Sequence, residues 1–212
     1  MILIGQYDSS FVRRVGIALT LYGLRFEHRP WSVFGDAEAI SEYNPLMRVP
    51  VLLLDDGEAV VESHAMLDFI DGLMPPGQRL FPVEEPARRR ALKVAALATG
   101  LADKAVSLFY ELRLHDQPSP DWMIRCRGQI EATLDALETD RAARDTPYWF
   151  GETIGHADIA VACALRHAGD SHPGLIRPEA RPALAAHCAR LEALPVFQAI
   201  QQEFVPRRDA GE

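Results

Sequence analysis

The chain has 212 residues, enough for one large domain or two small ones, each with an apolar core. Hydrophobic residues make up 48% of it, which indicates a folded globular protein rather than a disordered one. The formal net charge of −8 argues against a nucleic-acid-binding protein, because an acidic chain gains nothing from displacing the counterions of phosphates. No apolar run approaches the length of a membrane span, and residues 1–5 lack the basic start of a signal peptide. We therefore expect a soluble, cytoplasmic protein.

Cysteine and histidine do not form a metal or disulfide pattern in this sequence. The three cysteines, Cys126, Cys163 and Cys188, are odd in number and far apart, which argues against disulfides and zinc. Each falls within a helical apolar pattern, so we expect small buried side chains. The seven histidines show no metal-site spacing beside a carboxylate, and no metal is predicted.

The first part of the chain mixes strands and helices. The periodicity predicts strands and helices in alternation, with Gly23 ending the first helix and Asp55–Gly57 forming a hairpin turn. The predicted elements are a strand at 1–6, a helix at 11–22, a strand at 25–31, a short helix at 36–43, strands at 51–54 and 58–61, and a helix at 63–73. Right-handed crossovers make the first strands parallel and the hairpin pair antiparallel. This order is that of a thioredoxin-like α/β domain.

The second part of the chain is predicted to be entirely helical. A proline-rich stretch separates the two parts, which gives a first domain at 1–78, a linker at 79–86 and a second domain at 87–212. The expected helices are at 87–113, 121–139, 156–168, 179–193 and 196–204. Pro120 and Pro195 stand near helix starts, where a missing N–H has little effect.

Three hydroxyl groups follow the first strand, on Tyr7, Ser9 and Ser10. The N-terminus of the next helix favours an anion there, and such a site lowers the pKa of a thiol well below its usual value near 8.5. The alternative is that Asp8 or Ser9 merely caps the helix, which from this loop alone is the commoner outcome.

A second candidate feature is the segment 48–50, Arg-Val-Pro, at the entry to a strand. If the bond before Pro50 is cis, Val49 turns its N–H and C=O outward, where an extended peptide can pair with them. The alternative is an ordinary trans proline at a strand start.

A third candidate feature is Glu62-Ser63 at the start of the next helix. Ser63 can cap the helix, and the same N–H groups can hold a ligand carboxylate. Glu62 precedes the cap and can receive a ligand ammonium. His64 lies beside this pair, although an ordinary structural role is the more common one for such a histidine.

Together these segments resemble the soluble glutathione transferases over essentially the whole chain. The matching segments are 7–15, 44–50, 62–63 and 155–160, with a less specific match at 103–106 and 110–111. The resemblance is greatest to bacterial members of the serine-type classes. It implies a thioredoxin-like domain followed by an all-helical one, and a homodimer acting in detoxification. It also implies glutathione as co-substrate, no metal, and a small hydrophobic electrophile as second substrate.

The resemblance also assigns roles to residues. Ser9 falls where a serine hydrogen-bonds the glutathione sulfur, and Tyr7, Ser10 and Phe11 lie around it in the glutathione site. The backbone of Val49, beside the cis-proline Pro50, is assigned to pair with the cysteinyl unit of glutathione. Glu62 and Ser63 are assigned to the γ-glutamyl end, and Arg48 to the glycyl carboxylate. In the second domain, Asp158 is assigned to a helix-capping motif.

Three positions depart from the family pattern. Ser10 stands where proline is usual, Met47 where glycine is usual, and Gly155 where serine or threonine begins the capping motif. Glycine is a tolerable N-cap, and Ile154 with Ile159 can form a hydrophobic staple. Ser9 remains the favoured thiol donor, and Tyr7 is the alternative.

The absence of cysteine before residue 126 bears on the reaction. A hydroxyl can stabilise a bound thiolate but cannot form a mixed disulfide, which argues against glutaredoxin-like chemistry. We expect an electrophile pocket between the domains, with a wall from residues 101–112 and with Tyr110 and Arg113 reaching into it. The alternatives are a non-catalytic ligand- or protein-binding member of the same fold, and a glutathione-dependent peroxidase or isomerase.

Overall fold

The computed structural model describes residues 1–205. The first part of the chain contains a four-stranded sheet. The strands are β1 (Ile2–Ile4), β2 (Glu27–Arg29), β3 (Val51–Leu53) and β4 (Ala59–Val61), in the order β2-β1-β3-β4. β1 pairs in parallel with β2 and antiparallel with β3, and β3 and β4 form the antiparallel hairpin. The predicted strand directions are confirmed.

Alternating side chains of the sheet face two different layers. Leu3 and Leu52 are fully buried in the cluster that contains α1 (Ser10–Leu21) and α3 (Ser63–Gly72). Ile4 and Val51 pack on the opposite face against Ile40 of the short helix α2 (Ala37–Ser41). This is the period-two pattern of a strand with both faces covered.

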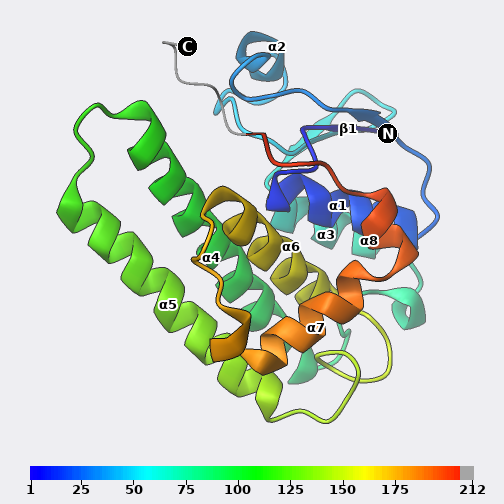
Figure 1. Cartoon of the computed structure of the whole chain (residues 1–212). Helices are drawn as coiled ribbons and strands as arrows, with labels where there is room; N and C mark the ends of the chain where they lie inside the picture. The colour runs from blue at the N-terminus through cyan, green and yellow to red at the C-terminus, as the bar shows by residue number, and fades with distance from the viewer. Residues whose placement is uncertain (206–212) are drawn as a thin grey trace.

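From residue 76 to residue 205 the regular elements are all helices. They are α4 (Ala87–Leu114), α5 (Pro120–Ala142), α6 (His156–Ser171), α7 (Pro182–Glu192) and α8 (Pro195–Ala199), with short 3-10 turns η1 (Pro76–Gln78) and η2 (Pro178–Ala180). Figure 1 shows α6 in the middle of this group, with α1 between it and the sheet. The expected fold, a thioredoxin-like domain followed by an all-helical one, is confirmed. In the described residues, no helix has both the length and the apolar character of a membrane span.

One apolar core runs from the first part of the chain into the second. Val12 and Val15 of α1 belong to the same buried cluster as Ile159 and Cys163 of α6. Cys126 and Cys163 are buried free thiols, as predicted, and Cys188 is partly buried. Sharing of a core fixes the orientation of α1 relative to the helical part.

Asp71 of α3 joins four separate segments. Its carboxylate accepts hydrogen bonds from the Tyr22 hydroxyl, from Nε2 of His156 at 2.8 Å, and from the backbone N–H of Phe81 at 3.0 Å. Burial opposes ionisation of Asp71, but its bonds to His156 and Tyr22 outweigh that effect and hold its pKa below the usual value. This carboxylate therefore fastens α1, α3 and the linker to the start of α6.

Gly155 occupies the N-cap of α6, and the structure explains why a larger residue is absent there. A Cβ at this position would lie 2.9 Å from the backbone carbonyl oxygen of Leu80. The Asp158 carboxylate accepts the Gly155 N–H at 2.8 Å and the Trp149 N–H at 2.7 Å. Ile154 and Ile159 lie in the same apolar cluster, as the expected staple requires. The Asp158 half of a capping box therefore forms. The side-chain half is missing, because the nearby backbone of the linker leaves room only for glycine at residue 155.

The helix predicted at 196–204 is wrong beyond residue 199. α8 ends at Ala199, and residues 201–205 have no regular structure. The Arg13 side chain accounts for this, because it donates to the backbone oxygens of Phe197 at 2.9 Å and Ile200 at 2.8 Å. Carbonyls bound to a guanidinium in this way no longer need helical N–H partners.

Candidate functional site

The end of β1 lies directly against the loop that leads into β3. Gly5 has a φ of +129°, and a Cβ there would lie 2.5 Å from Cγ2 of Val12 and 2.8 Å from Cβ of Val49. Only glycine fits this close approach. The β1–α1 loop and the segment before β3 are therefore neighbours, which brings two of the three predicted features together.

Ser9 stands at the N-cap position of α1, but its side chain makes no capping hydrogen bond. Its backbone oxygen accepts the N–H of Arg13 at 2.9 Å, and its side chain is partly exposed. The N–H groups of the first helical turn lack partners within the helix, and the helix dipole is positive at this end. The Ser9 hydroxyl is thus not used as a cap, and it lies where an anion is favoured.

The other two hydroxyl groups of this loop are buried. Ser10 is 4% exposed, and its Oγ has no hydrogen-bond partner among residues 1–205. Tyr7 is 8% exposed, and its ring stacks on His28 with centroids 3.8 Å apart. Burial raises the pKa of Tyr7 to about 12. Of the three hydroxyl groups, that of Ser9 is the most accessible to a ligand.

The bond between Val49 and Pro50 is cis. Asn44 holds the preceding loop: its side-chain amide donates to the carbonyl of Arg48 at 2.9 Å, and its Oδ1 accepts the N–H of Leu46 at 3.1 Å. Within residues 1–205, the backbone N–H and C=O of Val49 have no hydrogen-bond partner. They are available to an extended peptide laid beside them.

Met47, in the same loop, has a φ of +51°. Glycine adopts this left-handed conformation at no steric cost, which explains the family preference for glycine at this position. Met47 is half-exposed, so its side chain fits without displacing a neighbour. This departure from the family pattern leaves the loop intact.

Glu62 is the N-cap of α3, with a φ of +70°, and its side chain is exposed. Ser63 is the first residue of the helix and is 2% exposed. The expectation that Ser63 caps this helix is therefore wrong, because the chain turns at Glu62 instead. The Glu62 carboxylate makes no capping hydrogen bond.

Arg14 lies fully buried near Glu62, in a chain of polar contacts. Its Nη2 lies 3.3 Å from Nδ1 of His64, and Nε2 of His64 lies 2.9 Å from Oγ1 of Thr99, which donates to the Ala95 carbonyl. Burial and then the charge of Arg14 lower the pKa of His64 to about 4, so its ring is neutral at pH 7. Burial lowers the pKa of Arg14 to about 10, so its guanidinium is still charged at pH 7. The negative charge of Glu62 opposes this lowering of the pKa. A buried positive charge thus supports the start of α3.

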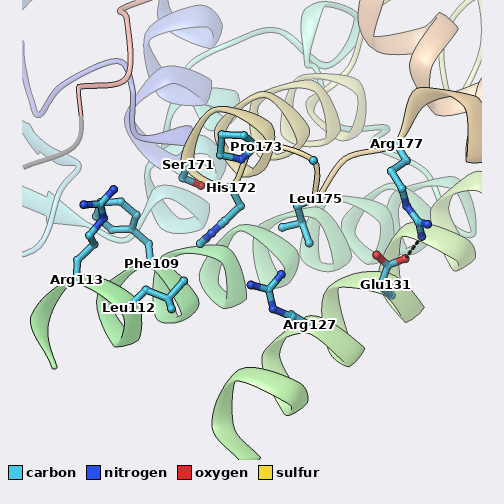
Figure 2. A pocket seen from close by; sticks show the side chains of 11 residues that line it. Phe109, Leu112, Arg113, Arg127, Glu131, Ser171, His172, Pro173, Leu175 and Arg177 are labelled. Carbon is cyan, nitrogen blue, oxygen red and sulfur yellow. Dashed lines mark hydrogen bonds and ion pairs between the residues drawn. The ribbon is translucent and has the colours of Figure 1, made fainter. Parts of the chain in front are cut away.

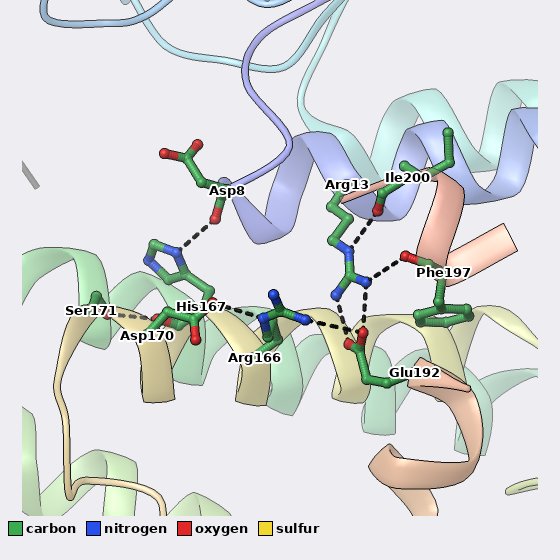
Figure 3. A network of polar contacts seen from close by, with 9 residues as sticks. All are labelled: Asp8, Arg13, Arg166, His167, Asp170, Ser171, Glu192, Phe197 and Ile200. Carbon is green, nitrogen blue, oxygen red and sulfur yellow. Dashed lines mark hydrogen bonds and ion pairs between the residues drawn. The ribbon is translucent and has the colours of Figure 1, made fainter. Parts of the chain in front are cut away.

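A second polar network ties the β1–α1 loop and α1 to the C-terminal helices (Figure 3). Nδ1 of His167 lies 2.9 Å from the backbone oxygen of Asp8. The Arg13 guanidinium forms two bonds with the Glu192 carboxylate, at 2.6 and 2.8 Å. Arg166 contacts the same carboxylate at 3.3 Å. Helix α6 therefore holds the loop that carries Ser9, and helices α7 and α8 hold helix α1, which follows that loop.

Of the side chains expected to line an electrophile pocket between the domains, Tyr110 lies against the first domain. Tyr110 lies edge-on to Phe34 at a centroid distance of 5.7 Å, and Arg48 is close enough to oppose the rise in its pKa caused by burial. Arg48 and Asp103 lie 4.0 Å apart across the two domains, and both are exposed, so this pair contributes little to stability. Most apolar side chains of the predicted wall, such as Ala105 and Leu108, instead fill the core.

Comparisons with known proteins decide the family. Residues 3–78 match the model of the N-terminal domain of glutathione S-transferases, and residues 120–190 match the model of their C-terminal domain. An uncharacterized GST-like protein, YibF of Escherichia coli K12, is 32% identical over 169 residues, spanning 78% of this chain and 80% of that protein. The chain belongs to the glutathione S-transferase family.

Solved structures of this family agree closely with the fold. A glutathione S-transferase from Methylobacterium radiotolerans, in complex with glutathione sulfonate, is 30% identical with a TM-score of 0.88, covering 98% of each chain. A glutathione transferase family member from Pseudomonas fluorescens Pf-5, with bound glutathione, is 28% identical with a TM-score of 0.81, covering 96% of this chain and 99% of that one. The similarity therefore extends over both domains.

Sequence reasoning missed the contributions of Arg14 and His167. The sequence did contain a signal for Arg14. Within residues 12–19 of the first helix, only Arg13 and Arg14 are charged, and the other residues are apolar. A charged residue in such a helix needs a buried partner. Nothing in the sequence indicated that His167 contacts residue 8, since 159 positions separate them.

Proposed function

We propose that this protein is a glutathione transferase that ionises the glutathione thiol with Ser9 and directs the thiolate at a small hydrophobic electrophile. The observation that carries the proposal is the Ser9 hydroxyl, which is partly exposed and unused as a cap at the N-terminus of a 12-residue helix. The adjacent segment offers the unpaired backbone of Val49, next to the cis bond at Pro50. Both features suit a peptide whose sulfur lies at the helix end.

The tripeptide is proposed to lie along the edge formed by three loops. Val49 pairs with the cysteinyl backbone, while Glu62 accepts the γ-glutamyl ammonium and the N–H groups at Ser63 receive its carboxylate. Arg48 reaches the glycyl carboxylate. Ser10, Phe11 and Tyr7 shape the floor around the sulfur, and the burial of Ser10 and Tyr7 suits support rather than proton donation.

Only a small free energy of interaction with Ser9 and the helix end is needed to stabilise the glutathione thiolate. A hydrogen bond to a charged group contributes about 1.5–3 kcal/mol, and a helix N-terminus about 0.3–1 kcal/mol. Together they lower a thiol pKa by about one to three units, since one unit corresponds to about 1.4 kcal/mol. The thiol loses its proton to solvent, the sulfur forms a bond to the electrophilic carbon, and the leaving group departs with its electron pair. A thiol with a pKa near 8.5 is then ionised in about a quarter to nearly all of the complexes at pH 7, compared with about 3% without the shift.

Three variants of the hydroxyl groups test the assignment. With an aryl halide as electrophile, we expect Ser9→Ala to lower kcat by about ten- to a hundredfold, the loss of one hydrogen bond to a charged group. Ser10→Ala and Tyr7→Phe should each keep kcat within about threefold of the wild type. A normal kcat for Ser9→Ala together with loss of turnover in Tyr7→Phe would assign the donor to Tyr7 instead.

The same assays separate the alternative functions. Peroxide and cis-enone substrates, run beside the aryl halide, distinguish peroxidase and isomerase activity from conjugation. A non-catalytic binding protein would take up glutathione without lowering its thiol pKa. The proposal includes a homodimer and a cytoplasmic location, which rest on family resemblance and can be checked by sedimentation and by fractionation.

A further inference from the structure

A hollow of about 610 Å³ opens between α4, α5 and the segment that follows α6 (Figure 2). Its lining residues belong to three short stretches of the helical part: 109–113, 127–131 and 171–177. No residue of the first domain lines it, so it is separate from the site around Ser9. Its volume lies in the range of small-molecule pockets.

The floor of this hollow is apolar. Phe109 and Leu175 are both 7% exposed, and Phe109 meets the ring of His172 edge-on at a centroid distance of 6.4 Å. Leu112 is 40% exposed and borders the opening. Such a floor accommodates the hydrocarbon body of a ligand, with a gain of about 0.8 kcal/mol for each methylene that is buried.

The rim of the hollow is positively charged, although the chain as a whole carries −8. Arg113, Arg127 and Arg177 line it, and Glu131 is the one acidic residue among the described residues of the lining. Glu131 is already paired, with Arg177 at 3.4 Å and with Arg181 at 2.5 Å. The acidic group is thus neutralised, and the guanidinium of Arg127 remains as a positive charge beside it.

Arg127 is the side chain best placed to receive an anion. Figure 2 shows its guanidinium directed from α5 toward the space beneath His172 and Leu175. It makes no hydrogen bond or ion pair with any other residue in the described part of the chain. Burial lowers the pKa of His172, and the positive charge of Arg127 lowers it further, so the potential of Arg127 reaches the lining.

We propose that this hollow binds an amphipathic carboxylate, with its anionic head on Arg127 and its hydrocarbon chain over Leu112, Phe109 and Leu175. A guanidinium offers a carboxylate two parallel hydrogen bonds, which fixes the orientation of the head group. The binding site is distinct from the proposed glutathione site, so both ligands can be bound at once.

Decanoate is a suitable probe, with decan-1-ol as a neutral probe of the same length. Titration calorimetry is carried out on the full-length protein in the presence of saturating glutathione, which keeps the first site filled. We expect saturable binding of one decanoate per chain, at least tenfold tighter than decanol, and weaker at high salt.

Four variants test whether this binding takes place at the hollow. Arg127→Gln should weaken decanoate binding about tenfold or more, Arg127→Glu should abolish it, and Leu112→Trp should block it without a change in charge. Arg125→Gln is the matched control, because Arg125 is exposed on the same helix but does not line the hollow. Arg125→Gln should bind decanoate like the wild type, and thermal melts confirm that each variant is folded.

Two results would overturn the proposal. One is the absence of saturable decanoate binding to the folded wild type. The other is wild-type affinity in Arg127→Glu, which would place any binding elsewhere, whatever the behaviour of Leu112→Trp. Both are independent of transferase activity, so a failure here leaves the assignment of Ser9 unaffected.

Discussion

His167 and Asp8 connect the helical domain to the loop that carries Ser9, with Nδ1 of His167 2.9 Å from the Asp8 carbonyl oxygen. Burial lowers the pKa of His167, so its ring is neutral at pH 7 and Nδ1–H donates to the carbonyl. The residue before Ser9 is thus held by a helix from the other domain. The position of the Ser9 hydroxyl therefore depends on how α6 packs.

Replacement of this histidine should affect turnover more than glutathione binding. We expect His167→Phe to lower kcat about two- to tenfold, the value of one buried hydrogen bond, with little change in KM for glutathione. It should also raise the thiol pKa of the bound glutathione, which a purely structural role would leave unchanged. The exposed His115 provides the control variant His115→Phe. An unchanged kcat and thiol pKa in His167→Phe would show that the loop keeps its geometry without this bond.

Arg14 should matter more for ligand affinity than for stability. Its Nε and Nη1 atoms are buried with no hydrogen-bond partner in the described part of the chain, so Arg14→Met removes a desolvated charge and is expected to leave the free energy of unfolding nearly unchanged or higher. The same change removes a buried positive charge near the start of α3, where the γ-glutamyl carboxylate is proposed to bind, and the donor to His64, so we expect the KM for glutathione to rise about five- to tenfold. Urea denaturation and steady-state kinetics measure the two effects. Loss of several kcal/mol of stability with an unchanged KM would show that Arg14 is structural only.

The glycine at the start of α6 should not tolerate a side chain, despite the usual preference for serine there. Gly155→Ser gains a capping hydroxyl worth at most a few tenths of a kcal/mol relative to glycine. The new Cβ would lie 2.9 Å from the Leu80 oxygen, and relief of such an overlap costs about 1–3 kcal/mol. We expect a net loss of about 1–3 kcal/mol in urea denaturation. A more stable Gly155→Ser variant would mean that the linker can move away from α6.

Stability should fall as the pH is lowered from about 6.5 toward 4. Burial lowers the pKa values of His64, His156, His167 and His172, in the case of His64 to about 4. The unfolded chain takes up protons on these residues below about pH 6.5 while the folded chain does not, so stability is complete above that pH and declines below it. The lowered pKa of Asp71 acts in the same direction, because its stabilising contribution is lost as it is protonated.

Urea midpoints at a series of pH values between 7.5 and 4.5 measure this dependence. His156→Gln should flatten part of it, since His156 is fully buried against Asp71. A urea midpoint that does not change over this range would mean that these histidines are protonated equally in both states.

Local signals were sufficient for most of the fold. Asp56-Gly57 predicted the hairpin, where Gly57 has a φ of +92°, and Pro120 marked a helix start that Ser119 caps. What the sequence did not reveal depends on partners far along the chain. The end of α8 follows from Arg13, and the need for Gly155 follows from the Leu80 carbonyl. Such contacts have no local pattern, because packing rather than propensity decides them.

In the candidate site, too, some features could be predicted from local sequence and others could not. The Ser9 loop and the proline at residue 50 were found from short-range patterns, but the cis bond could be established only from the folded backbone. Helix α3 begins one residue earlier than the cap assignment to Ser63 implied, because the positive φ of Glu62 makes the turn. A residue other than glycine in this conformation is rarely predictable from composition.

The pKa of the glutathione thiol in the binary complex is the most direct test of the account, measured from the ultraviolet absorbance of the thiolate as pH is varied. For the wild type we expect a pKa about one to three units below that of free glutathione, and for Ser9→Ala a pKa about one to two units higher than in the wild type. A bound thiol that titrates like free glutathione, or a Ser9→Ala complex with the wild-type pKa, would contradict the account.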